Sequence, residues 1–177
     1  MIELYEYNPR WEEAFIRLKT VFETELGNLI IGIEHVGSTS IKGMIAKPII
    51  DLDIIIENYD RLSEVVTKLN GLGYIHQLQW SFKGRETFER VNEKLPCHSE
   101  FIKHHLYVCD ENSIELKNHL DFRDYLRTHP EAVEEYNQLK VCLVTSKSTR
   151  AEYTEGKTHF IFNILHKIRK NKLDRNF

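Results

Sequence analysis

Two aspartates inside an aliphatic run constrain the fold more than any other feature of this sequence. The segment PIIDLDIII, residues 48–56, is rich in β-branched residues and predicts a buried strand. Pro48 is tolerated as its first residue, because that position need not donate a ladder hydrogen bond. Asp51 and Asp53 are two residues apart, so they project from the same face. Since burying an unpaired carboxylate is costly, we expect both side chains to have a partner.

An amphipathic strand with a polar outer face is the alternative explanation. Ile49 and Ile55 speak against it, because they share the face of the two aspartates. Oxygen ligands on one face suit Mg²⁺, or Mn²⁺ in its place, and Mg²⁺ takes one or two carboxylates and completes its shell with water and substrate phosphates. We therefore predict that Asp51 and Asp53 are metal ligands.

A run of small polar residues precedes the aspartates and directly follows a predicted strand over residues 29–36. Its members are Gly37, Ser38, Thr39 and Ser40. Glycine lets the backbone approach a ligand, and free N–H groups at a turn or helix start bind phosphate oxygens. Taken alone, the run is equally typical of a helix cap or a tight turn. Its position before the aspartates favours phosphate binding, with Lys47 as a further phosphate contact or as a solvated loop residue.

The remaining pattern predicts an α+β protein. Asn8 as a cap and Pro9 at the first position begin a helix that ends at Gly27, and a second helix spans residues 59–72. Further strands are expected over residues 74–80, 85–91 and 101–109, with turns near 83–84 and 92–96. Helical periodicity continues from residue 113, and Pro130 starts a new helix. A break at 146–149 precedes the last of three predicted helices. We expect one domain over residues 1–177, with an α/β core to about 110 and a helical layer over about 113–170.

Composition excludes several classes of protein. A content of 41% hydrophobic and 29% charged residues is typical of a folded globular chain. The net charge of -3 disfavours a nucleic-acid partner, which basic proteins attract. The first residues lack a signal-peptide pattern and no segment is apolar enough to span a membrane, so a cytoplasmic location without membrane contact is expected. Three cysteines without CxxC spacing predict neither a disulfide framework nor a zinc knuckle. The oligomeric state is left open.

Longer motifs resemble a known family. A Gly-Ser turn followed by Asp-Leu-Asp on a strand resembles the polymerase-beta-like nucleotidyltransferase superfamily. The motifs HVGSTSIKGMIAKPIIDLDIII, HHLYV, HLDFRDYLRTHPEAVEEYNQLK and YTEGKTHFI are similar to those of the GrpB family, from about residue 7 to 168. The resemblance implies a nucleotidyltransferase-like mixed sheet flanked by helices, with a helical C-terminal layer. It also implies transfer of a nucleotidyl group from a nucleoside triphosphate to a small-molecule acceptor, with magnesium held by the aspartates.

The sequence departs from the superfamily pattern at one position. Members of the superfamily usually supply a third carboxylate from a later strand, where this chain has His104 and His105. Neighbouring residues alternate across a strand, and His105 is predicted to face the site as a catalytic residue. Glu89 or Glu100 is an alternative third ligand. The missing carboxylate leaves open a catalytically inactive module that binds a nucleotide or a coenzyme.

Further substrate contacts are predicted in the helical half. His119, Arg123 and Arg127 are one turn apart on a helix and share a face that suits polyphosphate, although salt bridges to nearby acids are an alternative role. Lys140, Tyr153 and Lys157 match helical motifs of the family, which implies substrate contact. Two other kinds of site are disfavoured. The segment 97–105 has possible zinc ligands without a zinc-binding spacing, and Ser38 and Ser40 lack a G-x-S-x-G motif.

Overall fold

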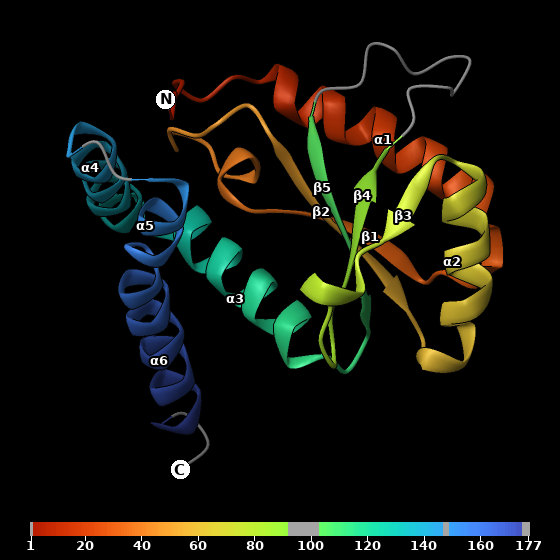
Figure 1. Cartoon of the computed structure of the whole chain (residues 1–177). Coiled ribbons are helices and arrows are strands. Elements are labelled where there is room, and N and C mark those ends of the chain that lie inside the picture. Colours follow the sequence, from red (N-terminus) through yellow and green to blue (C-terminus); the bar gives the residue numbers. More distant parts are fainter. Residues whose placement is uncertain (1, 92–102, 147–148, 175–177) are drawn as a thin grey trace.

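The fold is a five-stranded mixed sheet with helices on both faces and a helical C-terminal layer (Figure 1). The computed structural model describes residues 2–91, 103–146 and 149–174. Along the sheet, the strands are β1 (Gly32–Val36), β2 (Ile50–Ile56), β5 (His104–Asp110), β4 (Glu86–Arg90) and β3 (Tyr74–His76). β2 and β5 are parallel, and the other neighbouring pairs are antiparallel. The α+β class predicted from the sequence is confirmed.

Two helices cover the face of the sheet opposite the aspartates. α1 (Arg10–Leu26) and α2 (Leu62–Gly71) bury an apolar stripe against the strands. From β2 this core receives four side chains that are no more than 1% exposed: Ile50, Leu52, Ile54 and Ile56. Because side chains alternate along a strand, Asp51 and Asp53 point the other way, toward α3 (Ile114–Thr128). The aliphatic face of β2 therefore anchors the strand in the core, and the opposite face, with the two aspartates, is available to form a site.

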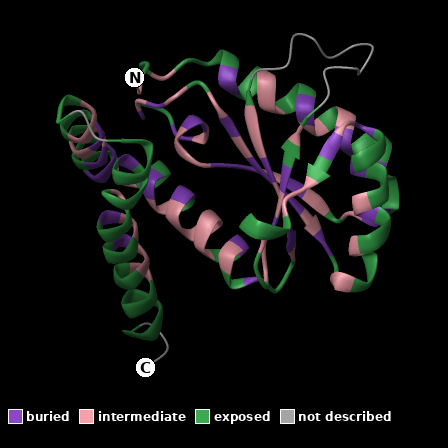
Figure 2. Cartoon of the chain, in the orientation of Figure 1, coloured by how far each residue is buried: buried purple, intermediate pink, exposed green. Residues whose placement is uncertain are grey.

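The C-terminal layer packs on α3 through a second apolar cluster. α4 (Pro130–Thr145), α5 (Arg150–Glu155) and α6 (Thr158–Asp174) follow α3. The cluster joins α3, α4 and α6 to the loop after the Gly37 turn; it comprises Ile41, Met44, Leu126, Ala132, Val133, Tyr136, Phe160 and Ile164. Figure 2 shows that much of the outer surface of α4 and α6 is exposed. Every helix in the described ranges is too short or too polar to span a bilayer.

Several boundaries differ from the sequence prediction, and three of them have a clear local cause or consequence. The first strand begins at Gly32, after a 3₁₀ turn over Gly27–Leu29. The strand predicted over residues 74–80 stops at His76, because the Ser81 hydroxyl donates to the Gln77 carbonyl and a 3₁₀ turn, η4 (Leu78–Trp80), forms instead. The single last helix is divided at Gly156, where a Cβ would lie 2.5 Å from Cδ2 of Leu143 in α4. Glycine at 156 thus permits close packing of α5 on α4.

Some predictions fall on residues outside the described ranges. These are the turn over residues 92–96, the first two residues of the predicted strand 101–109, the alternative ligand Glu100 and part of the disfavoured zinc cluster, Cys97 and His98.

Candidate functional site

Each of the two aspartates on β2 has its own imidazole partner. The parallel register of β2 and β5 sets His105 opposite Asp51, and His105 Nδ1 lies 2.7 Å from Asp51 Oδ1. His119 of α3 approaches from above the sheet, with Nδ1 2.8 Å from Asp53 Oδ2. His105 thus faces the aspartates, whereas His104 turns to the opposite face and contacts the Tyr74 hydroxyl at 2.6 Å.

Asp53 carries a polar atom that is buried and has no partner among the described residues. The residue is 0% exposed, and its Oδ1 accepts no hydrogen bond from the described residues. A buried carboxylate oxygen left in this state is costly unless a cation or a water occupies the adjacent space. Asp51 is more open, with its side chain 28% exposed. One enclosed and one accessible carboxylate on the same face are suitable oxygen donors for Mg²⁺, whose other positions are filled by water and phosphate. The described residues contain no cluster of three or more metal-binding side chains.

The environment of His119 favours its charged form. Burial alone would lower the pKa of this imidazole, but the hydrogen bond to Asp53 and the negative charge of Asp53 outweigh burial. The net effect is a pKa raised above the usual histidine value. His119 therefore compensates the negative charge of Asp53.

The turn at Gly37 lies directly against Asp51. Gly37 has φ +70°, and a Cβ placed on it would overlap Asp51 Oδ2 and lie 2.9 Å from Asp51 Cβ. Ser38–Ser40 then form a 3₁₀ turn, in which the Ser40 hydroxyl donates to the Gly37 carbonyl at 2.7 Å. Only glycine combines this backbone conformation with this contact. The predicted phosphate turn and the predicted metal ligands are therefore adjacent in space.

A buried histidine holds the Gly37 turn in place. Thr39 is 1% exposed, and its hydroxyl donates to the Ile49 carbonyl at 3.3 Å. His35 Nε2 lies 3.0 Å from the Thr39 hydroxyl oxygen and donates to it, since the hydroxyl proton is already used. Burial lowers the pKa of His35 to about 4, so the ring is neutral near pH 7. Thr39 thus connects β1 to the start of β2 and has no exposed surface for a substrate.

Two lysines and a tyrosine form a cationic wall beside Asp51. Lys47 Nζ lies 5.3 Å and Lys157 Nζ 4.6 Å from the centre of the Tyr153 ring. Burial lowers the pKa of both lysines; Arg150 lowers that of Lys47 further, and Lys47 lowers that of Lys157, while Asp51 opposes both shifts. Burial raises the pKa of Tyr153 to about 12. Close cations that repel one another in a partly buried place are suited to an anionic ligand.

Lys140 lies behind this wall. It is 1% exposed, and its ammonium donates to the Ile45 carbonyl. Burial, with a smaller effect of Lys157, lowers its pKa to about 7. Lys140 therefore supports the 41–46 loop from below and is covered from solvent.

The three residues predicted to share a helical face, His119, Arg123 and Arg127, have two different roles. His119 reaches Asp53, but Arg123 is 9% exposed and donates to Glu34 at 2.6 Å and to the His35 carbonyl at 3.0 Å. Arg127 donates to the Ser40 carbonyl through Nε and Nη2, at 3.1 and 2.9 Å. Both arginines thus bind the chain on either side of the Gly37 turn and stabilise it.

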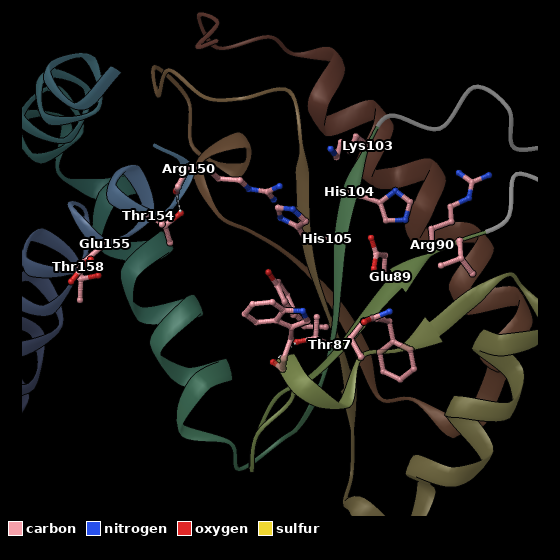
Figure 3. A pocket seen from close by; sticks show the side chains of 16 residues that line it. Thr87, Glu89, Arg90, Lys103, His104, His105, Arg150, Thr154, Glu155 and Thr158 are labelled. Carbon is pink, nitrogen blue, oxygen red and sulfur yellow. Dashed lines mark hydrogen bonds between the residues drawn. The ribbon is translucent and has the colours of Figure 1, made fainter. Parts of the chain in front are cut away.

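A cleft of about 1230 Å³ opens beside His105, between the sheet and the C-terminal helices. Figure 3 shows its lining from β4 and β5, and Arg150, which extends from α5 toward His105. Small-molecule sites usually measure roughly 300–1,000 Å³, so the cleft has room for a nucleotide and part of a second molecule. Glu89, an alternative third ligand, lines the same cleft.

Arg150 and Lys103 were missed by the sequence prediction. A signal for Arg150 exists, because Thr149 and Glu152 form a capping box that starts α5 at residue 150. Helical spacing then places Arg150 and Tyr153 on one face of α5, and Lys157 follows in the turn before α6. Lys103 has no comparable local signal.

The fold is of the nucleotidyltransferase-like kind. The fold resembles the poly(U) polymerase Cid1 in a structure bound to MgATP, with a TM-score of 0.54 and 8% identity over 76% of this chain and 45% of that one. At this identity the likeness concerns the fold alone.

Within this class, the chain belongs to the GrpB family, whose model, described as GrpB protein, matches residues 1–167. It is 30% identical to the glutamate-rich protein GrpB of Alkalihalophilus pseudofirmus, over 93% of this chain and 94% of that protein. It is 32% identical to the UPF0157 protein YqkA of Bacillus subtilis over 99% of this chain, which spans only 49% of that relative. A crystal structure of the conserved protein GrpB from Enterococcus faecalis aligns over 97% of this chain and 99% of that one, with a TM-score of 0.81 and 28% identity. The predicted family is confirmed.

Proposed function

We propose that this protein is a magnesium-dependent nucleotidyltransferase that moves a nucleotidyl group from a nucleoside triphosphate to a small-molecule acceptor. The observation that carries the proposal is the contact of the Gly37 turn with Asp51, beside an oxygen of Asp53 that accepts no hydrogen bond from the described residues. A place for a cation and a place for phosphate are thereby adjacent. Mg²⁺ bound to the two aspartates would neutralise charge on the triphosphate.

The side chains around the aspartates have separate roles in this proposal. The Gly37–Ser38 backbone and the lysines at 47 and 157 bind the β- and γ-phosphates, and Tyr153 keeps the two ammonium groups apart. The acceptor oxygen attacks the α-phosphorus, and the bond from the α-phosphorus to the oxygen that bridges to the β-phosphate breaks. Pyrophosphate then leaves past Lys47 and Lys157. His105, oriented by its hydrogen bond to Asp51, accepts the acceptor's hydroxyl proton at Nε2.

A module that binds a nucleotide or coenzyme without transferring it is the second candidate. One observation favours it: a histidine stands at the strand position where the superfamily usually has a third carboxylate, and both aspartates are already hydrogen-bonded to imidazoles. In this function the cationic wall and the turn keep their roles, and pyrophosphate is not released.

Two measurements test the proposal. Calorimetry with ATP, GTP, CTP and UTP, with and without Mg²⁺, measures binding, and a pyrophosphate-release screen with candidate acceptors measures transfer. Asp51→Asn is expected to abolish Mg²⁺-dependent binding and to change the free energy of unfolding by no more than about 1 kcal/mol, because the side chain is partly exposed.

Asp60→Asn is the matched control, since Asp60 is exposed and lies beyond the far end of β2. It should bind like the parent chain. Binding without pyrophosphate release in any acceptor mixture would favour the second candidate. No binding of any nucleotide by the parent chain would refute the transferase and would leave only the coenzyme-binding form of the second candidate.

A further inference from the structure

We infer that the acceptor carries a planar aromatic ring, such as a nucleobase, and that this ring stacks on Trp80. The inference rests on the proposed function and adds to it the chemical class of the acceptor. It is carried by the exposure of Trp80, by its fixed position in the cleft and by its place relative to the Gly37 turn.

Trp80 exposes an aromatic surface that a folded protein normally covers. The residue is 67% exposed, whereas Trp11 in α1 is 3% exposed. Indole is the largest apolar ring among the side chains, and covering it with another ring is favourable by area burial and by stacking. Trp80 lines the same cleft as His105, Tyr107 and Arg150. A ring bound there would cover the indole and lie in the same cleft as His105, the proposed proton acceptor.

The backbone around Trp80 is held in one position. Its N–H donates to the Gln77 carbonyl at 3.0 Å, and its own carbonyl accepts from the Thr87 hydroxyl of β4 at 3.0 Å. The Ser81 hydroxyl accepts from the Thr87 N–H at 2.9 Å. η4 is therefore fastened to β4 by side-chain hydrogen bonds. A preorganised platform binds a ring without the entropy cost of ordering a loop.

The other open ring of the cleft already has a partner. The guanidinium of Arg85 lies 4.8 Å from the centre of the Tyr107 ring and 4.5 Å from that of Phe82. One face of Tyr107 is thus occupied by a cation, and burial raises its pKa above the usual tyrosine value, so it stays neutral. Trp80 is the better platform for a substrate ring.

The strand order assigns the ring to the acceptor. The Gly37 turn follows β1, the aspartates lie on β2, His105 lies on β5, and Trp80 is fastened to β4. The phosphate turn and Trp80 are therefore on opposite sides of the aspartates. In phosphoryl transfer the attacking and leaving oxygens are roughly in line. If pyrophosphate leaves toward the Gly37 turn, the acceptor enters from the side of His105 and Trp80.

Intrinsic fluorescence tests this inference, because the chain has two tryptophans and one of them is buried. The signal of Trp80 is the difference between the parent chain and Trp80→Phe, which leaves the core intact. With Mg²⁺ and inorganic tripolyphosphate present to fill the phosphate site, adenosine and uridine are titrated. Saturable quenching of the Trp80 signal by a nucleoside is expected, and no quenching of the Trp11 signal.

Variants separate stacking from other effects. By equilibrium dialysis, Trp80→Ala is expected to weaken nucleoside binding about tenfold or more, since base stacking on an aromatic side chain is worth that much. Trp80→Phe should retain most of the affinity. Leu78→Ala is the matched control, because Leu78 is 72% exposed on the same turn and is absent from the cleft lining. It should bind nucleosides like the parent chain.

Two outcomes would overturn the inference and leave the proposed function standing. In the first, Mg²⁺-nucleoside triphosphates bind but no nucleoside quenches Trp80. In the second, a nucleoside triphosphate with Mg²⁺ quenches Trp80 with the affinity that calorimetry gives for it and abolishes further quenching by nucleosides, so the stacked ring belongs to the donor. A different result would refute the proposed function: calorimetry would detect no triphosphate binding to either the parent chain or Trp80→Ala.

Discussion

Replacing Gly37 with alanine tests whether the turn and Asp51 form one unit. The backbone at Gly37 has φ +70° and ψ −175°, a conformation that essentially only glycine adopts and that costs another residue about 1–3 kcal/mol. The new Cβ would overlap Asp51 Oδ2, so the carboxylate must leave its rotamer, at about 0.5–1.5 kcal/mol. It would also lose the hydrogen bond to His105, worth about 1 kcal/mol at this partly exposed place. We expect Gly37→Ala to lower the free energy of unfolding by roughly 2.5–5.5 kcal/mol in total.

Gly43→Ala supplies the control for backbone strain. Gly43 has φ +78°, and a Cβ there meets nothing within 4 Å. This variant should lose only the strain of about 1–2 kcal/mol. Urea denaturation gives both free energies, and calorimetry with Mg²⁺-ATP shows whether Gly37→Ala alone loses binding. Equal destabilisation by the two variants, with binding kept in both, would refute the contact between the turn and Asp51.

The remaining predictions concern stability. Burial lowers the pKa of His35 from 6.5 in the unfolded chain to about 4 in the native one, so the unfolded chain is protonated more readily. The contribution of His35 to the free energy of unfolding is therefore full above pH 6.5 and declines by about 3 kcal/mol as the pH falls to 4. Denaturation of His35→Gln at several pH values should lack this decline. Arg123→Lys should cost about 2 kcal/mol by losing the buried planar contacts, and Arg127→Lys less than about 1 kcal/mol, since Arg127 is more exposed; equal urea midpoints would contradict this difference. Gly156→Ala should cost about 1–3 kcal/mol in thermal unfolding, and Leu143→Ala, which makes room for the added methyl, should partly rescue it. Failure of the rescue would exclude the clash with Leu143 as the cause.

Local patterns predicted the parts of the site that a single element determines. The alternation of β2 places both aspartates on one face, and the alternation of β5 directs His105 rather than His104 to that face. A small-residue turn after a strand needs no distant information either. The first helix, with Pro9 at its start and Gly27 at its end, was likewise set by local signals.

Contacts between distant segments were outside the reach of these patterns. His119 was predicted to contact substrate, but it lies 66 residues from Asp53 and bonds to it across α3 and β2. The shared face of Arg123 and Arg127 was visible in the sequence, whereas the carbonyl groups opposite them were not. The partners of a side chain depend on how helices pack on the sheet, which periodicity does not specify.

The imidazoles that bond the two aspartates come from segments 54 and 66 residues further along the chain, so the site exists only when the sheet and α3 are assembled. A ligand of this site consequently binds the native chain and not the unfolded one. At a free concentration one hundred times its Kd, such a ligand stabilises the native state by about 2.7 kcal/mol. A rise in the thermal unfolding midpoint is therefore a general readout for screening small-molecule collections, and it can be applied before the reaction has been identified.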